Sequence, residues 1–246
     1  MNLPVYNIVK KIYIFLKGGS SLKALHPLYD KKNSCALCSH RFYSKKVRSR
    51  FLKPQRYDTD FFVDYENPQF HPIVYDVVIC PKCGYASTEQ FSKLFPPGSE
   101  NQVKEKVMKN WKYQPYDQER TLQQAINAYK LAIYCANLKK EKSSVLASLT
   151  LRLSWLYRML DDIQQERAFA LHALKFYTTA YLEETFPSNS SEVRLLYIIG
   201  ELNYRLGFQQ QALLYFSEII YKHKNHPDRK TFERTKERWH EIRSIS

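Results

Sequence analysis

The sequence predicts an α+β multidomain protein in which a small β-rich module precedes an all-α helical region. Three observations lead to this prediction. Four of the five cysteines form two C-x-x-C pairs. A run of β-branched residues leads directly into the second pair, and apolar residues recur at helical spacing after residue 99. We expect an arm over residues 1–24, a β-rich module over 25–95 and a helical domain over 96–246.

The composition favours a folded protein of a reducing compartment. Hydrophobic residues make up 44% of the 246 positions, which is enough for a packed core. The formal net charge of +14 permits contact with nucleic acid but does not establish it. A secreted disulfide scaffold is usually shorter and richer in cysteine, so we expect a cytoplasmic protein.

The arm over residues 1–24 is mostly apolar, with lysines at positions 10, 11 and 17. Its longest apolar run, Ile12–Leu16, is shorter than the roughly 20 residues of a spanning helix or the roughly 7–15 of a signal h-region. The apolar positions do not form one narrow stripe. We therefore expect a helix packed on the body, or an extension, rather than an amphipathic membrane anchor.

The two cysteine pairs predict a structural metal site. Two residues between paired cysteines let both sulfurs reach one ion, and structural Zn²⁺ takes four ligands in a tetrahedron. Two such pairs fill all four positions and leave none for a substrate. We therefore expect one structural Zn²⁺ per chain, held by Cys35, Cys38, Cys80 and Cys83.

The residues around the pairs favour a zinc ribbon. Val74–Ile79 reads as a strand that ends at the second pair, and Gly84 stands where the following turn often needs a positive φ. Segment 39–79 exceeds the usual spacing of roughly 15–20 residues, so it must hold an insertion or extra strands. His40 and His71 could replace a thiolate, but four thiolates suffice and we expect neither to bind metal.

Two disulfides, a redox pair or an iron–sulfur centre are the alternatives to zinc. A thioredoxin-like redox motif needs a βαβ context, and the surrounding sequence has none. The fifth cysteine, Cys135, stands alone within a helical pattern.

A basic stretch over residues 41–56 follows the first cysteine pair. Phe42, Tyr43 and Phe51 are interleaved with its cations, a combination used by nucleic-acid-binding surfaces. Charge runs are more often solvated faces, so nucleic-acid binding is the alternative function rather than the first. The basic residues concerned are Arg41, Lys45, Lys46, Arg48, Arg50, Lys53 and Arg56.

Four acidic residues come next, at Asp58, Asp60, Asp64 and Glu66. A catalytic or second metal site would need a phosphate-binding loop or a nucleophile–base pair beside them, and the sequence shows neither. We expect them to pair with the basic stretch. No nucleotide-binding, hydrolase or kinase signature is present, so we do not expect an enzyme.

The segment Pro96–Ser99 is typical of a linker, and the chain after it reads as helix. Capping residues and apolar spacing set the expected bounds. The expected helices span 101–113, 119–138, 143–160, 163–182, 192–206 and 208–222, and a last one begins at 226–228.

Residues 193–226 show the spacing of a tetratricopeptide repeat. Gly200 would lie at a close helix contact and Gly207 at the turn, followed by Ala212, Phe216 and Pro227. Such hairpins must stack on neighbours to bury their apolar faces, and stacked repeats offer grooves to peptides. An ordinary helical bundle is the alternative.

The order of these motifs resembles the bacterial family catalogued as domain of unknown function 2225. The matching segments are Leu28–Lys32, Cys35–Cys38, Lys45–Ser49, Tyr57–Phe61, Glu66–Pro68 and Tyr75–Ala86. The resemblance covers roughly residues 25–225. It implies a zinc-ribbon-like front with the four cysteines as ligands and a tetratricopeptide-like helical back.

One departure from the family concerns the position just after the Asp-Phe step, where members often carry another cysteine. Phe62 and Val63 occupy that region here, which argues against an essential fifth thiolate. The resemblance implies an architecture and no activity. We therefore expect a non-enzymatic, zinc-binding adaptor whose helical repeats bind a protein or peptide partner, with nucleic-acid binding through residues 41–56 as the alternative.

Overall fold

The computed structural model describes residues 25–185, 189–223 and 227–245. The arm over 1–24 lies outside these residues, as does the first half, 186–188, of the break expected over 186–191. The described chain begins with β-hairpins and continues as helices, so the α+β class is confirmed. None of its described helices combines the length and the apolar character needed to cross a membrane.

The front part contains three separate antiparallel hairpins. Their strands are β1 (Leu28–Ser34) with β2 (Arg41–Val47), β3 (Pro54–Tyr57) with β4 (Val63–Tyr65), and β5 (Val78–Ile79) with β6 (Ala86–Ser87). Hairpin β3–β4 and three short 3-10 helices lie in the segment between the cysteine pairs, where extra structure was expected. These 3-10 helices span Ser49–Phe51, Pro68–Phe70 and Pro72–Tyr75.

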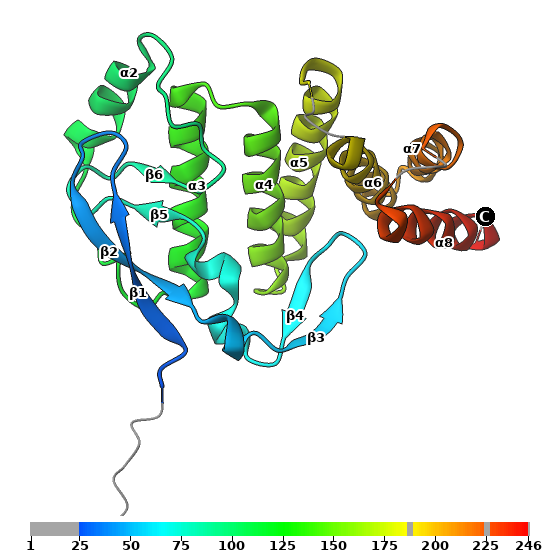
Figure 1. The fold of residues 1–246 in the computed structure, drawn as a ribbon, viewed down its shortest axis with the longest axis horizontal. Coiled ribbons are helices and arrows are strands. Elements are labelled where there is room, and N and C mark those ends of the chain that lie inside the picture. The colour runs from blue at the N-terminus through cyan, green and yellow to red at the C-terminus, as the bar shows by residue number, and fades with distance from the viewer. Residues whose placement is uncertain (1–24, 186–188, 224–226, 246) are drawn as a thin grey trace, which may run out of the picture.

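The helices agree with the expected ones to within a few residues, apart from the first. They are α2 (Ser99–Lys106), α3 (Leu122–Lys139), α4 (Ser143–Arg158), α5 (Ile163–Glu183), α6 (Asn189–Leu206), α7 (Gln209–Lys222) and α8 (Arg229–Ile245). Figure 1 shows α3, α4 and α5 side by side, with α6, α7 and α8 beyond α5 and hairpin β3–β4 reaching towards them.

The first expected helix, over 101–113, is shorter in the structure. Helix α2 ends at Lys106, and a 3-10 turn over Met108–Asn110 follows. The chain leaves the helix there because Trp111 is held by the second cysteine turn, where its indole Nε1 donates to the Pro81 carbonyl at 2.9 Å. The next helix begins at Leu122 because Thr121 and Gln124 form a capping box.

Helices α6 and α7 pack as closely as the spacing of their small residues suggests. A Cβ added to Gly200 would lie 2.6 Å from Cε1 of Phe216, so the missing side chain lets the Phe216 ring approach. Gly207 ends α6 with φ +92°, a conformation that favours glycine. Ala212 and Phe216 are fully buried. The expected close contact and turn are therefore present.

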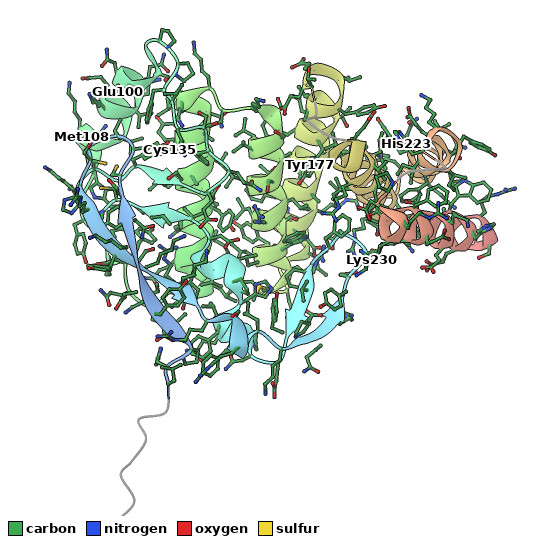
Figure 2. The ribbon with its side chains drawn as sticks, viewed as in Figure 1. Glu100, Met108, Cys135, Tyr177, His223 and Lys230 are labelled. Carbon is green, nitrogen blue, oxygen red and sulfur yellow. The ribbon has the colours of Figure 1, made fainter. Side chains whose placement is uncertain are left out.

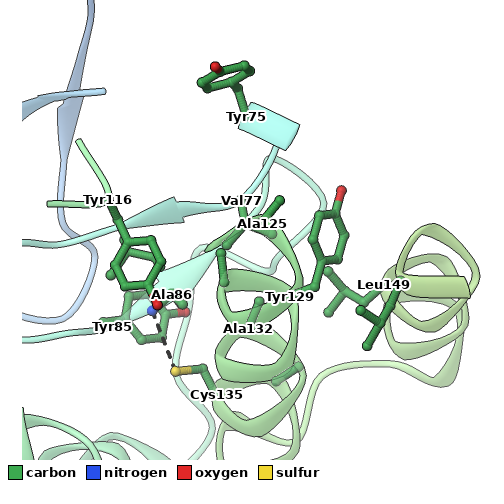
Figure 3. Packing of buried hydrophobic residues seen from close by; sticks show 14 of the residues in the cluster. Tyr75, Val77, Tyr85, Ala86, Tyr116, Ala125, Tyr129, Ala132, Cys135 and Leu149 are labelled. Atoms are coloured by element: carbon green, nitrogen blue, oxygen red, sulfur yellow. Dashed lines mark hydrogen bonds between the residues drawn. The ribbon is translucent and has the colours of Figure 1, made fainter. Parts of the chain in front are cut away.

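One cluster of buried side chains joins the front part to α3 and α4. Figure 3 shows Tyr85 and Ala86, from the second cysteine turn, beside Ala132 and Cys135 of α3. The Ala86 N–H donates to the Cys135 sulfur at 3.5 Å. The cysteine turn is therefore packed directly on α3, and the fifth cysteine serves this contact.

Candidate metal centre

The four paired cysteines meet at one point of the fold. Their sulfurs all lie within 4.8 Å of one another, and they approach across the pairs: Cys35 to Cys83 at 3.5 Å and Cys38 to Cys80 at 3.6 Å. A tetrahedron with Zn–S bonds of about 2.3 Å has sulfurs about 3.8 Å apart. The observed set matches that size and can hold one metal ion.

Two turns of the same backbone pattern present these sulfurs. In the first, Cys35 N–H donates to the His40 carbonyl and Ser39 N–H donates to the Cys35 carbonyl. In the second, Cys80 N–H donates to the Tyr85 carbonyl and Gly84 N–H donates to the Cys80 carbonyl. Both turns have a positive φ at the equivalent residue, +56° at Ser39 and +73° at Gly84. The positive φ expected at Gly84 is thus confirmed.

The second turn is fixed on two sides. A Cβ added to Gly84 would lie 2.4 Å from the Trp111 ring, so the indole rests directly on the glycine backbone. On the other side, Ala86 is fully buried against α3. The position of Cys80 and Cys83 is therefore set by the helical core as well as by the hairpin.

The thiol pKa values follow from contacts inside the cluster. The hydrogen bond between the sulfurs of Cys35 and Cys83 lowers the pKa of Cys35 to about 5. Burial raises the pKa of Cys80 to about 11, and the same hydrogen bond together with burial raises the pKa of Cys83. A divalent cation among the sulfurs would favour all four thiolates, because a coordinating thiol gives up its proton.

Neither histidine is placed among the sulfurs. His71 is buried, its Nδ1 accepts from Ile73 N–H at 3.2 Å, and its Nε2 lies 2.9 Å from the Val63 carbonyl. Both of its ring nitrogens are thus used by the backbone. His40 stacks on Phe42.

The basic stretch is largely neutralised by neighbouring acids. Four of its cations form ion pairs: Lys45 with Asp30, Lys46 with Glu89, Lys53 with Glu66, and Arg56 with Asp64. Arg48 donates to the His26 carbonyl and lies over the Tyr29 ring. Among the described residues, only Arg41 and Arg50 of this stretch lack an acidic or carbonyl partner.

The pairing expected for the acidic residues is correct for Asp64 and Glu66 and wrong for Asp58 and Asp60. These two side chains, at the tip of hairpin β3–β4, contact arginines of the helical part instead. Arg158 of α4 reaches Asp60 at 2.7 Å and Asp58 at 3.0 Å. Arg205 of α6 reaches Asp58 at 2.5 Å. Because the hairpin tip points towards the helices, Asp58 and Asp60 cannot reach the cations of the basic stretch.

The rest of the hairpin tip is held by α6 and α8. The Thr59 hydroxyl donates to the buried carboxylate of Glu201, which also binds Arg238 at 3.0 Å. The Tyr197 hydroxyl donates to the Thr59 carbonyl at 3.0 Å. Phe61 adopts φ +70° and packs against the Tyr197 ring. The tip therefore occupies a binding site built by three helices.

Sequence reasoning missed the helical side of this contact. The residues concerned are Trp155, Arg158, Glu201, Arg205 and Arg238. A signal was present at Glu201, a charged residue that follows the apolar run Leu195–Ile199 on the buried side of α6. Such a residue needs a buried partner, but the sequence does not show which one.

A groove on the helical part adjoins the hairpin tip. A cavity of about 570 Å³ lies between α4, α5 and α6 and is lined by apolar side chains including Leu151, Trp155, Tyr177, Leu195 and Ile198. A second cavity of about 330 Å³, near the cysteine turns, shares Gln90 and Arg152 with it. A third, of about 390 Å³, shares Phe61 and Arg194. Each of the two smaller cavities therefore adjoins the 570 Å³ groove through shared lining residues.

Comparison with known proteins assigns most of the chain to one family. No curated protein matches the chain. Residues 28–242 match the family described as "Uncharacterized protein conserved in bacteria (DUF2225)". The match spans both cysteine turns, the hairpin tip and nearly all the described helices. The chain therefore belongs to the DUF2225 family of bacterial proteins.

Proposed function

We propose that the protein is a non-enzymatic cytoplasmic adaptor, in which a structural zinc ion fixes the front part and tetratricopeptide-like helical hairpins bind a protein partner. The groove between α4 and α6 carries the proposal. Its volume and its largely apolar lining are typical of a site that accepts part of another molecule.

The cysteine site supports a structural role for the ion. Four thiolates complete the coordination of Zn²⁺, and catalytic zinc sites keep a position open for water or substrate. Both cysteine turns are also packed into the core, so the ion would stabilise the framework that carries the groove. The donor set of four sulfurs favours zinc over magnesium or calcium, which prefer oxygen ligands.

The test is capture of partners from the native cell with the groove open or filled. Ser148 lines the groove and is half-buried, so Ser148→Phe would place a ring in the cavity without removing a core side chain. Gln211 is exposed on α7 and lines none of the three cavities, so Gln211→Phe is the matched control. We expect partners that Ser148→Phe loses and Gln211→Phe keeps. Equal capture of partners by both variants would refute the groove as the partner-binding site.

Nucleic-acid binding remains the alternative. It requires a cationic surface, and the pairing of Lys45, Lys46, Lys53 and Arg56 with acids reduces the free charge of the basic stretch. Binding of single-stranded oligonucleotides at low salt, falling steeply as salt rises, would support it. A loss of that binding in an Arg41→Gln, Arg50→Gln variant would assign it to the basic stretch.

A further inference from the structure

The floor of the groove is apolar and open to a ligand. Leu151 of α4 and Leu195 and Ile198 of α6 form its base, and the rings of Trp155 and Tyr177 flank them. Figure 2 shows Tyr177 on α5, next to α6. Burial raises the pKa of Tyr177 to about 12, so its hydroxyl stays neutral. Such a floor suits bulky apolar side chains rather than a strongly hydrated ligand.

The rim of the groove is positively charged. Its cations are Lys142, Arg152 and Arg194, against one carboxylate, Glu184. Glu184 is already engaged, because it accepts from Ser144 N–H at the start of α4. Among the described residues the Lys142 ammonium has no acidic partner, and the Arg194 side chain is 67% exposed although it pairs with Asp228. Arg152 lies 3.7 Å from the Asp76 carboxylate, so Lys142 and Arg194 provide most of the positive charge that the rim can offer to a ligand carboxylate.

Cationic side chains also line the two adjoining cavities. On one side Arg152 leads to the cavity that Lys31, Lys45 and Lys46 line. On the other side Arg194 leads to the cavity lined by Lys230 and Arg234. In Figure 2 Lys230 lies at the start of α8, close to the tip of hairpin β3–β4. Because Lys31, Lys45 and Lys46 are paired with Asp30 or Glu89, the charge offered to a ligand lies mainly on the side of Arg194, Lys230 and Arg234. A ligand that also entered this third cavity would be extended.

The chain's own hairpin tip shows what these helices hold. Asp58 and Asp60 are bound by Arg158 and Arg205, and the next residue, Phe61, packs on Tyr197 and lies under the Arg234 guanidinium. The helices therefore already bind a short segment in which carboxylates stand next to an aromatic ring. Phe61 also lines the groove, so the groove continues directly from this bound segment.

We infer that the groove binds an extended acidic peptide that carries bulky apolar side chains, supplied by a partner protein. The inference rests on the proposed adaptor function and names the chemistry of its partner. A nucleic acid fits less well, because the apolar floor formed by Leu151, Leu195 and Ile198 offers nothing to its regularly spaced phosphates. A peptide can place its carboxylates opposite the cations and its apolar side chains on the floor.

The test is selection from a random peptide library on the full-length, metal-loaded protein, followed by affinity measurement with the enriched peptides. We expect peptides rich in Asp or Glu with aromatic or aliphatic side chains, whose affinity falls as salt rises. Arg152→Gln with Arg194→Gln should weaken their binding at least about tenfold. Lys175→Gln, on an exposed lysine of α5 outside the cavities, should leave it unchanged.

The outcomes separate this inference from the proposed function. The single variant Arg194→Gln controls for misfolding, because the Arg194 side chain is mostly exposed and its removal should not disturb the fold. This variant alone should also weaken peptide binding. A different result would be enriched peptides that lack acidic residues, bind the arginine variants normally and do not bind Ser148→Phe. That result would overturn the inference of an acidic ligand but would still support the groove as the binding site. Enrichment of no peptide, or binding of oligonucleotides alone, would overturn both.

Discussion

Asp60 and Arg158 form a largely buried ion pair across 98 positions of the chain, with Nη2 of the arginine 2.7 Å from Oδ2 of the aspartate. Asp60 is 0% exposed and also accepts from the Trp155 indole at 3.0 Å. Burial opposes its ionisation, yet the hydrogen bonds and charge of Arg158 hold the pKa of Asp60 below its usual value. The pair fastens the segment between the cysteine turns to the helical stack.

Removing this carboxylate should destabilise the whole chain. Asp60→Asn keeps the shape but leaves Arg158 with less compensation in a buried position, so we expect a loss of roughly 3 kcal/mol in the free energy of unfolding. Asp64→Asn is the control, because its pair with Arg56 is exposed and should cost less than about 1 kcal/mol. Urea unfolding measures both, and equal losses would contradict the role given to Asp60.

The second cysteine turn should tolerate no side chain at Gly84. Gly84→Ala combines a positive φ with a Cβ 2.4 Å from the Trp111 ring, so both the turn and the indole must move. Gly98→Ala has a similar φ of +79° but nothing within 4 Å of the added carbon. We expect Gly98→Ala to lower the free energy of unfolding by about 1–2 kcal/mol and Gly84→Ala to lower it clearly more. Thermal unfolding measures both. Similar melting temperatures would show that the indole contact is unimportant.

His71 should make stability depend on pH. Burial lowers the pKa of His71 from its ordinary 6.5, so the unfolded chain takes up this proton first as the pH falls. The stability that the neutral ring supplies is therefore present above about pH 6.5 and is lost as the pH falls towards the folded pKa. His71→Asn keeps an acceptor for Ile73 N–H and removes the titration. We expect its unfolding free energy to fall less between about pH 7 and pH 5, and an unchanged pH dependence would contradict this assignment.

Metal removal should loosen α3 together with the front part. Ala86 donates to Cys135, and both are fully buried in the cluster that contains Cys80 and Cys83. Helices α6, α7 and α8 share a separate buried cluster. After chelation we expect faster amide exchange over residues 78–87 and in α3, and smaller changes in α7. Faster exchange confined to residues 28–47 would show that the second turn stays folded without metal.

The sequence predicts well those features that a few neighbouring residues decide. The turn at Gly84 and the end of α6 at Gly207 follow from local backbone preferences. The start of α4 at Ser143 is correct, but a serine cap is not: Ser143 is the first residue of the helix, and the N-cap, Lys142, makes no side-chain cap hydrogen bond. The four cysteines were identified because their spacing encodes the geometry of a turn.

The sequence could not show which distant groups meet. The arginines of the basic stretch are nearer to Asp60 in the sequence than Arg158 is. Asp60 nevertheless pairs with Arg158, because hairpin β3–β4 points towards the helices. Lys139 is similar: it reads as a cation at a helix end, but it is 0% exposed, pairs with Glu141 at 2.6 Å and faces the Phe95 ring. Buried charges of this kind are determined by the assembled core, not by local propensity.

The metal content of the purified protein tests the central claim most directly. Elemental analysis should give about one zinc per chain, lost in Cys83→Ser and kept in Cys135→Ser, because only the former sulfur belongs to the four-cysteine cluster. Protein without zinc, protein with iron in its place, or disulfides between the paired cysteines by mass spectrometry would contradict the structural zinc site.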